Sequence, residues 1–515
     1  MPNITYEIES TGIKNFTYKT PLLILDENGE LQVVYSQEKS TYLYIKKITF
    51  LNLVGKDDKG KIVSYEPLDY VNEYLLSRHI EDGIEESCQD SKALIHYFSY
   101  LLATQAIWDK KHDNEDYDEL IDPPRPEWDK FGIRKNHRIT YKYHASLQKE
   151  GGNGSGLSQS VCTAYMRKVV NFYTFHLRKG VRFNNPPFEF QSYRMYEQRS
   201  GTSMSAKYSF VVNSSDLKLT FPKSKRNDGG SIPDSRRDLK PLSNKEWREV
   251  ENILTKTKRV LKIVKGQEKL TRLSEEYCLY FILLRFTGLR KEEGASLHLG
   301  QIICPDMNKP ILRFGVGDKY GSLTKGVNGV NKSRRTIMPS SVMMALYKYT
   351  QSERYKKRLE KFKALCKEKR EKGDDAFFNV VDGVSEYKNY LFLSSNGVPF
   401  YTKLTEINTR WSEVRKTASL NLKQSIESTV VHNLRSTFAV AIFRMLLKKR
   451  DTEHALSILS DFLGHEDLAT TLHYLKIAEG NPTGDEIWED ILDYLDIFSD
   501  VENEMDDVIK PSFTA

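Results

Sequence analysis

The sequence predicts a multidomain α+β protein that is mainly helical with small β elements. Its 515 residues are too many for one ordinary domain, so two or three are expected. The first sixty residues alternate between apolar and polar side chains, as half-buried strands do, whereas most of the rest has the apolar spacing of amphipathic helices. With 39% hydrophobic residues, the chain can build a core in each domain.

Residues 1–65 are predicted to form a β-rich N-terminal appendage. Four strand-like segments (YEIES, LLILD, LQVVY and TYLYIKKITFLNLV) alternate with turn signals at residues 26–29 and 57–60. From residue 66 to residue 185 the pattern is helical, and periodic apolar residues fall within 70–80, 93–107 and 161–177. We expect a separate helical domain there.

Residues 186–240 are predicted to be a hairpin (YSFVVNSSDLKLTF) followed by a basic linker with Gly and Pro, which is typical of a domain boundary. A second, mixed domain is expected over residues 241–479. Its first helix can be capped by Ser243, with Glu246 as the partner in a capping box.

Further elements of the second domain follow in order. A helix over 275–287 is expected to end at Gly288, and two strands (PILRFGV and RRTIMP) come next. A long charged helix, roughly 341–372, precedes a strand (YLFLSS), and helices complete the domain. Residues 480–515 are predicted to form an acidic tail with an amphipathic helix, whose apolar side chains are Trp488, Ile491, Leu492, Leu495 and Phe498.

Composition excludes several classes of protein. The charged fraction of 29% and the lack of a long apolar run exclude a membrane span, and the first residues lack the pattern of a secretory signal. Five cysteines are widely scattered, with no CxxC motif or Cys/His cluster, so neither a disulfide framework nor a zinc site is expected. We therefore expect a cytoplasmic protein without a metal or other cofactor.

The charge of the chain is unevenly distributed. Residues 480–515 contain eleven acidic residues and one lysine, a net charge of −10, so the first 479 residues carry +7 − (−10) = +17. A basic body with an acidic tail is typical of a protein that binds a polyanion, although a simply solvated tail fits the charge equally well.

Two basic stretches are candidates for binding nucleic acid. In KFGIRKNHRITYKYH, cations alternate with aromatic residues, which suits phosphate neutralisation and packing against sugar and base; a solvated loop is the alternative. The basic linker is the second stretch, and it could lie against DNA or be free in solvent. The candidate DNA-binding residues are Lys130, Arg134, Lys135, Arg138, Tyr141, Lys142, Lys223, Lys225 and Arg226.

Another set of residues suits chemistry on a phosphodiester. The segment LRFTGLRKEEGASL carries Arg290, VHNLRSTFAV carries His432 and Arg435 one helical turn apart, and LGHEDLATTLHYLK carries His465 and Tyr474. Phosphoryl transfer depends on positioning and on cationic stabilisation of the nonbridging oxygens, which the planar fork of arginine supplies. A tyrosine can attack the phosphate if a neighbouring group accepts its proton. Each fragment alone is also typical of ordinary structural residues.

Local spacing refines this set. Glu293 follows Arg290 by three residues and could orient its guanidinium group. His465 and Tyr474 would point to opposite faces of one continuous helix, because nine residues at 100° each separate them. Asp467 is a natural N-cap, so a new helix is expected to begin after it, which lets His465 and Tyr474 approach one phosphate from different elements.

TGLRKEE, HNLR, LGH and the tyrosine nine residues beyond that histidine together resemble the tyrosine recombinase (phage integrase) superfamily. The resemblance covers roughly residues 241–478 and, more loosely, 68–180. It implies a C-shaped DNA clamp with a helical core-binding domain and a mixed catalytic domain of the DNA breaking-rejoining type. The β-rich start and the tail go beyond a minimal member.

The resemblance also implies a role for each residue. Tyr474 would attack the scissile phosphate and form a 3′-phosphotyrosine, while Arg290 and Arg435 hold the nonbridging oxygens. His465 would donate a further hydrogen bond to the phosphate, and His432 would accept the proton of the tyrosine. The general acid of the family is a lysine in a β-turn. Lys325, in TKG, fits that pattern best, with Lys332 as the alternative and Lys319 as a more distant one.

The implied function is site-specific DNA recombination, as by the integrase of a mobile genetic element. The partners would be double-stranded DNA with specific recombination sites, further copies in a synaptic homotetramer (a monomer or dimer when free), and accessory DNA-bending or directionality proteins in a bacterial nucleoid. The tail would pack on a neighbouring protomer or on its own domain. A type IB topoisomerase and a catalytically inactive DNA-binding protein are the alternatives.

Overall fold

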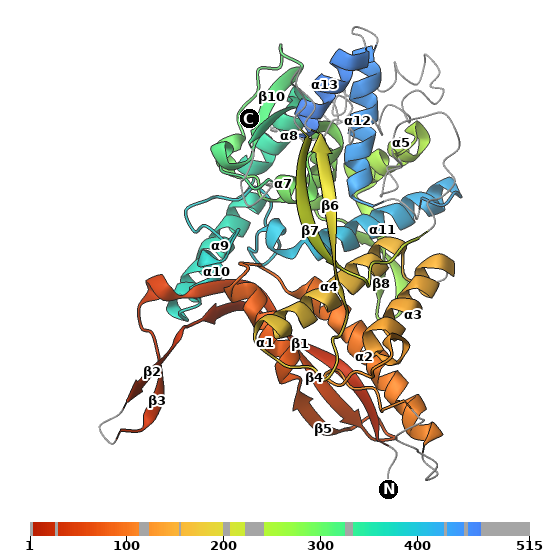
Figure 1. Ribbon diagram of the computed structural model, residues 1–515. Helices are drawn as coiled ribbons and strands as arrows, with labels where there is room; N and C mark the ends of the chain where they lie inside the picture. The colour runs from red at the N-terminus through yellow and green to blue at the C-terminus, as the bar shows by residue number, and fades with distance from the viewer. Residues whose placement is uncertain are drawn as a thin grey trace, which may run out of the picture. The chain divides into compact units, whose positions relative to one another are not determined.

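The computed structural model describes residues 4–25, 29–112, 123–153, 156–198, 207–221, 241–324, 333–426, 430–447 and 452–464. It divides the chain into two compact units. Unit 1 comprises residues 1–228 with 374–383, and unit 2 comprises residues 229–373 with 384–515. The described residues are mainly helical with small antiparallel sheets, which confirms the predicted α+β class (Figure 1).

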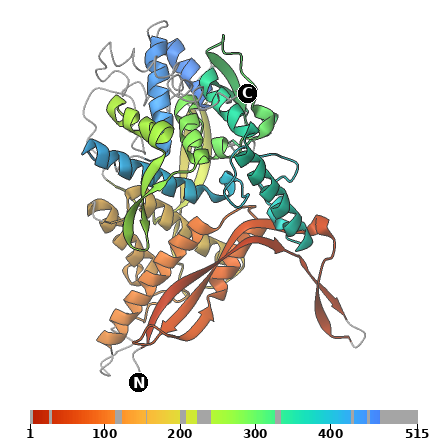
Figure 2. The same ribbon diagram turned by 180° about the vertical axis from the view of Figure 1, so that it is seen from behind.

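Unit 1 begins with an antiparallel sheet in the strand order β1-β4-β5 (Figure 2). Its strands are β1 (Thr5–Tyr18), β4 (Leu43–Lys56) and β5 (Ile62–Pro67). Ile48 and Leu51 of β4 are fully buried, so this strand joins the sheet to the core of the unit. The strands predicted in the first sixty residues are confirmed.

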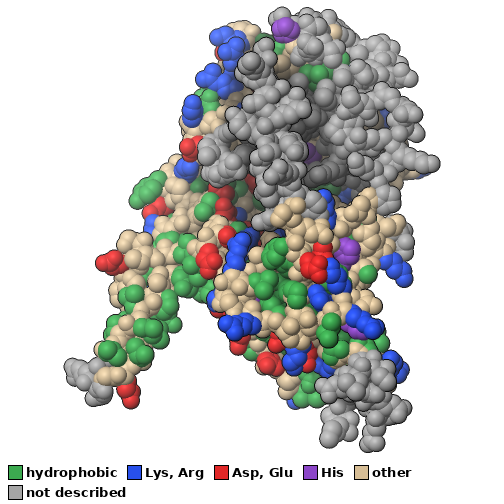
Figure 3. Space-filling view, viewed as in Figure 1, with side chains coloured by type: hydrophobic (Ala, Val, Ile, Leu, Met, Phe, Trp, Pro, Cys, Tyr) green, Lys and Arg blue, Asp and Glu red, His purple; other side chains and the backbone are tan. Residues whose placement is uncertain are grey.

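A second pair of strands forms a separate hairpin between β1 and β4 along the chain. It consists of β2 (Pro21–Leu25) and β3 (Leu31–Tyr35). Its large apolar side chains are exposed, including Leu23 at 70% and Leu25 at 68%, and green apolar patches are visible along the hairpin in Figure 3. The hairpin therefore adds no buried side chains to the core of unit 1.

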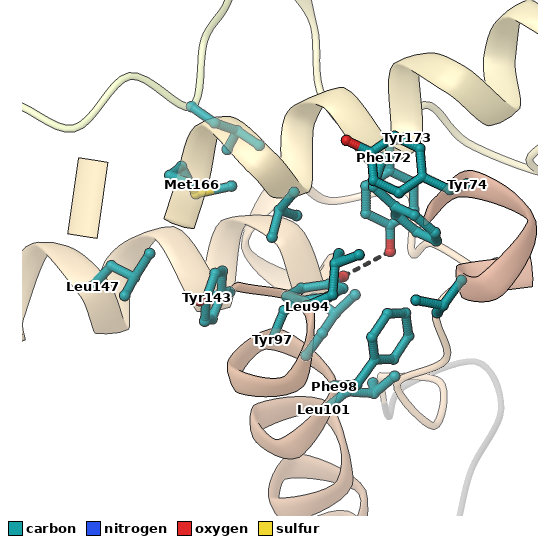
Figure 4. Close-up of a cluster of buried hydrophobic side chains, with 14 of the residues drawn as sticks. Tyr74, Leu94, Tyr97, Phe98, Leu101, Tyr143, Leu147, Met166, Phe172 and Tyr173 are labelled. Atoms are coloured by element: carbon teal, nitrogen blue, oxygen red, sulfur yellow. Dashed lines mark hydrogen bonds between the residues drawn. The ribbon is translucent and has the colours of Figure 1, made fainter. Parts of the chain in front are cut away.

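Four helices build that core: α1 (Asp69–Ile80), α2 (Cys88–Lys111), α3 (Ile139–Asn153) and α4 (Gln159–Arg178). They contain the three helical segments that the apolar spacing predicts. Their buried faces carry aromatic rings in edge-to-face contact, and the hydroxyls of Tyr97 and Tyr173 are joined by a hydrogen bond of 2.7 Å (Figure 4). The aromatic residues fix the helices against one another, because such rings combine a large buried surface with a preferred geometry.

The hairpin predicted within residues 208–221 is wrong. Instead, β7 (Lys207–Ser215) pairs with β6 (Phe190–Gln198), which lies upstream. Asp216 ends the pairing, because its carboxylate accepts hydrogen bonds from the Glu189 backbone N–H at 3.0 Å and from the Tyr141 hydroxyl at 2.6 Å. Residues 374–383 also belong to unit 1, since the short helix α10 (Ala376–Asn379) packs on β1 and β4.

Unit 2 combines helices with the antiparallel hairpins β8–β9 and β10–β11. In chain order its described elements are α5 (Asn244–Asn252), β8 (Arg259–Val264), β9 (Gln267–Arg272), α6 (Glu275–Thr287), α7 (Lys291–Ala295), β10 (Ile311–Val316), β11 (Arg334–Pro339), α8 (Ser340–Gln351), α9 (Glu353–Glu371), α11 (Leu404–Leu422), α12 (His432–Leu447) and α13 (Thr452–Leu463). Short 3-10 turns occur in unit 1 at Lys39–Thr41 and Lys135–His137. In unit 2 they occur at Leu299–Gln301, Asp318–Tyr320 and Phe400–Lys403, and a π-turn lies at Ile253–Thr257.

Helix α6 is the centre of unit 2. Its residues from Glu276 to Thr287 are all buried, and it packs against α7, α8, α12 and β11. Gly288 ends it in the left-handed conformation, with φ of 63°, as the sequence predicts. The capping box of Ser243 with Glu246 at the start of α5 is also confirmed.

Three details of unit 2 differ from the prediction. The charged helix expected over 341–372 is two helices, because Ser352 is extended (ψ 147°) and its hydroxyl accepts the Tyr355 N–H as the N-cap of α9. YLFLSS is a buried segment with isolated bridges, not a strand. The hairpin β8–β9 was not expected; its turn at Lys265-Gly266 has φ of 52° and 77°, as a two-residue hairpin turn requires.

Among the described residues, no helix has the length and apolar character needed to cross a membrane.

Candidate active site

Arg290 is positioned by the junction between α6 and α7. After Gly288 reverses the chain, Arg290 lies at the N-cap position of α7, and its own backbone N–H donates to Glu293 Oε2 at 2.7 Å. Its guanidinium group donates to Glu293 Oε1 at 3.0 Å and to the Gly464 carbonyl at 3.2 Å. Glu293 and the Gly464 carbonyl thus hold the guanidinium group, while a quarter of the Arg290 side chain remains exposed to solvent.

Gly288 cannot be replaced without disturbing this junction. A Cβ atom at residue 288 would overlap the ring of Phe438, and the positive φ disfavours any other residue. The glycine lets α12 pack closely against the end of α6, and its carbonyl accepts a hydrogen bond of 2.7 Å from Arg435 Nη1. One glycine therefore places both candidate arginines.

Glu293 is the electrostatic centre of the site. Its side chain is fully buried and accepts hydrogen bonds from Arg290, from Arg334 Nη2 at 2.5 Å and from Thr324 Oγ1 at 2.9 Å. Burial alone would raise the pKa of this carboxyl, but the charges of Arg334, Arg435 and Arg290 outweigh it and lower the pKa to about 2. Glu293 therefore stays ionised and holds three cations together.

His432 and Arg435 are brought together by α12. His432 is the first residue of this helix and is half-buried, while Arg435 follows one turn later and is 1% exposed. Arg435 Nη2 donates to the Leu463 carbonyl at 2.5 Å, in addition to its bond with Gly288. The HxxR spacing thus places a half-buried imidazole one helical turn before a buried guanidinium group, whose charge acts on the Glu293 carboxylate.

Helix α13 ends against these arginines. Three successive carbonyls at its C-terminus accept hydrogen bonds from three different guanidinium groups: Phe462 from Arg334, Leu463 from Arg435 and Gly464 from Arg290. The last carbonyls of a helix lack partners within the helix, and its C-terminus carries partial negative charge, so cations are favoured there. The next residue in the chain is His465.

Several predicted site residues lie outside the described residues. These are Lys325, Lys332, His465 and Tyr474, the N-cap candidate Asp467, the linker residues Lys223, Lys225 and Arg226, and the acidic tail. Their neighbours are described on both sides of the cluster: Thr324 binds Glu293, and Gly464 binds Arg290. Lys319 is exposed in a 3-10 turn, where its backbone N–H donates to Ser333 Oγ.

The basic segment of residues 130–144 is largely engaged within unit 1. Arg138 is 6% exposed, and its guanidinium group donates to the carbonyls of Gly132, Ile133 and Pro186. This geometry gives Arg138 a structural role, and its contact with DNA stays a prediction.

Other residues of the segment also have partners within the protein. Lys135 forms ion pairs with Glu189 and Asp216, and Lys130 pairs with Glu127. Tyr141 donates to Asp216, and burial and this carboxylate raise the pKa of its hydroxyl. Arg134 is exposed, and Lys142 is partly exposed with a pKa lowered by burial.

Arg334 is the member of the cluster that the sequence did not reveal. It is the first residue of β11, its side chain is 7% exposed, and it contacts both Glu293 and the end of α13. The pair Arg334-Arg335 was visible in KSRRTIMP, and strand alternation could have indicated that one arginine faces inward. Only the tertiary structure shows which of the two does so.

The cluster has a clear chemical capacity. Two guanidinium groups with rigid supports and an imidazole one helical turn away can bind a phosphate and move a proton beside it. Among the described residues, no group of three or more His, Cys, Asp or Glu side chains could hold a metal ion.

Comparisons with known proteins find one family model that is similar to part of this chain. A model of the phage integrase family matches residues 254–480. No curated protein matches the chain.

Similar solved structures include an integrase of the transposon Tn1549 in complex with a circular intermediate DNA and the XerH site-specific recombinase bound to a difH substrate. Each is 14% identical to this chain. The first comparison covers 82% of this chain and 98% of the other, with a TM-score of 0.39; the second covers 80% and 88%, with a TM-score of 0.37.

Proposed function

We infer that this chain, which matches a phage integrase family model over residues 254–480, is a tyrosine recombinase that cleaves and rejoins DNA at specific sites through a covalent bond to Tyr474. The observation that carries the proposal is the convergence of Arg290 and Arg435 on the buried carboxylate of Glu293, directly before the segment that contains His465 and Tyr474. A carboxylate that is ionised and buried fixes both cations, so little reorganisation is needed when a phosphate binds.

The chemistry assigns one task to each residue. The Tyr474 oxygen bonds to phosphorus while the bond to the 5′ oxygen breaks, leaving a 3′-phosphotyrosine and a 5′-hydroxyl. Arg290 and Arg435 neutralise the nonbridging oxygens, and His465 donates a further hydrogen bond to them. The ordinary pKa of tyrosine is about 10, so a proton acceptor is needed, and His432 fills this role.

The leaving oxygen also needs a proton. Lys325 supplies it in our proposal, with Lys332 as the alternative. Attack by the 5′-hydroxyl of another strand then reverses the reaction and joins the new strands. No ATP is required, since the phosphotyrosine conserves the energy of the original bond.

A groove of about 1000 Å³ in unit 1 supports DNA as the partner. It lies between α4 and the chain that follows β7. Arg167 and Arg178 on the polar face of α4 line it, together with Lys218, and no carboxylate is among the lining residues that the structure describes. Cations without competing acids suit contacts with a phosphate backbone, which position a protein on DNA. We propose this groove, rather than the segment around Arg138, as a DNA-binding surface.

The assembly on DNA extends the proposal. Strand exchange between two duplexes requires several active sites, so we propose a homotetramer in the synaptic complex and a monomer or dimer when free. Integration and excision of a mobile element in the bacterial cytoplasm are the corresponding biological reactions, and accessory DNA-bending or directionality proteins would select between them.

A nicked suicide substrate tests the proposed reaction. It carries the recombination site with a nick just 3′ of the scissile phosphate, so the short 5′-hydroxyl strand diffuses away and the covalent intermediate accumulates. The wild-type protein should form a protein–DNA adduct, and Tyr474→Phe should not. An adduct that persists in Tyr474→Phe would rule out this nucleophile, and relaxation of supercoiled DNA without a specific site would favour a topoisomerase.

A further inference from the structure

The end of α13 is held by three arginines, and one of them has no role in the reaction described above. Arg334 donates to the Phe462 carbonyl, next to the carbonyls that Arg435 and Arg290 bind. It also forms an ion pair with Glu293 Oε2 at 2.5 Å. Its side chain is 7% exposed, compared with 25% for that of Arg290.

The packing around Arg334 leaves little freedom for the turn that follows α13. A Cβ atom at residue 464 would overlap the Arg334 side chain, and Gly464 has φ of 61°, which favours glycine. Gly464 therefore lies directly on the stem of Arg334, while its carbonyl binds Arg290. The position of the chain immediately before His465 is thus defined by Arg334 on one side and by Arg290 on the other.

Only an arginine can make both contacts of this residue. The planar guanidinium group spans two acceptors at fixed separation, here a carboxylate and a backbone carbonyl, whereas a lysine ammonium concentrates its charge at one atom. Within the part of the chain that the structure describes, Arg334 donates to Glu293 and to the end of α13. These contacts support an effect on DNA cleavage that passes through other residues of the cluster.

We propose that Arg334 is a positioning residue for DNA strand cleavage: it fixes the 462–464 turn and Glu293, and through them the phosphate-binding geometry of Arg290. This inference rests on the proposed function. Misplacing catalytic groups by about 1 Å can slow a reaction about 100-fold, so we expect Arg334→Lys to slow cleavage about 10-fold to 100-fold. DNA affinity should be unchanged.

Two modified substrates separate the routes by which Arg334 could act. A methylphosphonate at the scissile position is neutral, so it has less need of the arginines that stabilise the nonbridging oxygens. A sulfur in place of the 5′ bridging oxygen leaves without a proton, so it needs no general-acid lysine. If Arg334 acts through Arg290, the defect of Arg334→Lys shrinks on the methylphosphonate and persists on the sulfur substrate.

The experiment compares single-turnover cleavage by the full-length protein on these substrates at saturating DNA. Arg335→Lys is the matched control, because Arg335 is the next residue of β11, is exposed, and contacts the Tyr320 hydroxyl instead. It should cleave at the wild-type rate. Gly464→Ala provides a second perturbation of the same contact and should give the same substrate pattern if Arg334→Lys fails to fold.

The possible outcomes are distinct. A cleavage defect that shrinks on the methylphosphonate supports the inference. Cleavage by Arg334→Lys at the wild-type rate overturns it. Rescue of Arg334→Lys by the bridging sulfur also overturns it, because Arg334 would then act through the general-acid lysine. Failure of the proposed function itself would appear separately, as an adduct that still forms in Tyr474→Phe.

Discussion

At the scale of single residues, Glu293 concentrates the charge of the candidate site. Its carboxylate lies among the guanidinium groups of Arg290, Arg334 and Arg435, and because Glu293 is fully buried, bulk solvent screens these interactions little. The stability of the protein should therefore depend on the ionisation of the Glu293 carboxyl group.

Replacing Glu293 by Gln should therefore lower stability. Removing one partner of a buried ion pair leaves uncompensated charge and costs about 3–5 kcal/mol, so the urea midpoint at pH 7 should fall markedly. Glu292→Gln is the matched control, because Glu292 is exposed and should change little. A variant as stable as the wild type would contradict the charge balance described here.

The pH dependence of stability should change as well. Because the native pKa of Glu293 is about 2 and its ordinary value is 4.5, the unfolded chain binds the proton first as the pH falls. The wild-type protein should thus lose the contribution of Glu293 between these two pH values and keep it above them. Urea unfolding across this range should show a smaller decline in Glu293→Gln.

Gly288 makes a second prediction at this scale. Gly288→Ala should lower the thermal midpoint, because the positive φ costs roughly 1 kcal/mol and the new Cβ overlaps Phe438. Gly373→Ala isolates the backbone term, since Gly373 has φ of 66° but no atom within 4 Å of its ideal Cβ. Equal losses in the two variants would show that the contact with Phe438 is unimportant.

At the scale of elements, the sequence predicts secondary structure correctly where residues that are neighbours in the chain determine it. The helix ending at Gly288 and the capping box of Ser243 depend on contacts within a few residues, so they could be predicted. The break at Ser352 and the pairing of β6 with β7 depend on competing local and distant partners, and they were missed.

The candidate site divides in the same way. The spacings of Arg290 with Glu293 and of His432 with Arg435 follow from one helical turn, whereas Arg334 joins the cluster only because β11 lies beside α13. The segment containing Arg138 was read as a DNA-binding surface from its charge. Sequence could not show that carbonyls of the same unit satisfy this arginine.

The role of Arg138 can be tested by its effect on stability. Arg138→Met removes three charged hydrogen bonds to backbone carbonyls, each worth about 1.5–3 kcal/mol when measured singly, so the thermal midpoint should fall. Arg134→Met, four residues away and exposed, should leave it unchanged. A fully stable Arg138→Met protein with weaker DNA binding would contradict the structural role and support the predicted contact of Arg138 with DNA.

At the scale of the whole molecule, the charge is divided between a basic body and an acidic tail. The first 479 residues carry +17 and the last 36 carry −10, by the charges counted above. Such a body attracts DNA at long range, while individual phosphate contacts determine how steeply affinity depends on salt.

We expect the phosphate contacts to be made by the arginines that line the groove beside α4. Each of Arg167→Ala and Arg178→Ala should reduce the slope of log affinity against log salt by about 1, because each phosphate contact releases about one counterion. Lys92→Ala, an exposed residue on α2 that does not line the groove, serves as the control. Unchanged slopes in both arginine variants would place the DNA elsewhere.

The identity of the DNA-linked residue tests the central claim most directly. The covalent adduct formed by the wild-type protein on the suicide substrate can be digested with protease and nuclease, and the peptide that retains the nucleotide can be sequenced by mass spectrometry. The account predicts a phosphotyrosine at Tyr474, joined to the 3′ end of the cleaved strand. A nucleotide linked to any other residue, or joined through a 5′ phosphate, would contradict it.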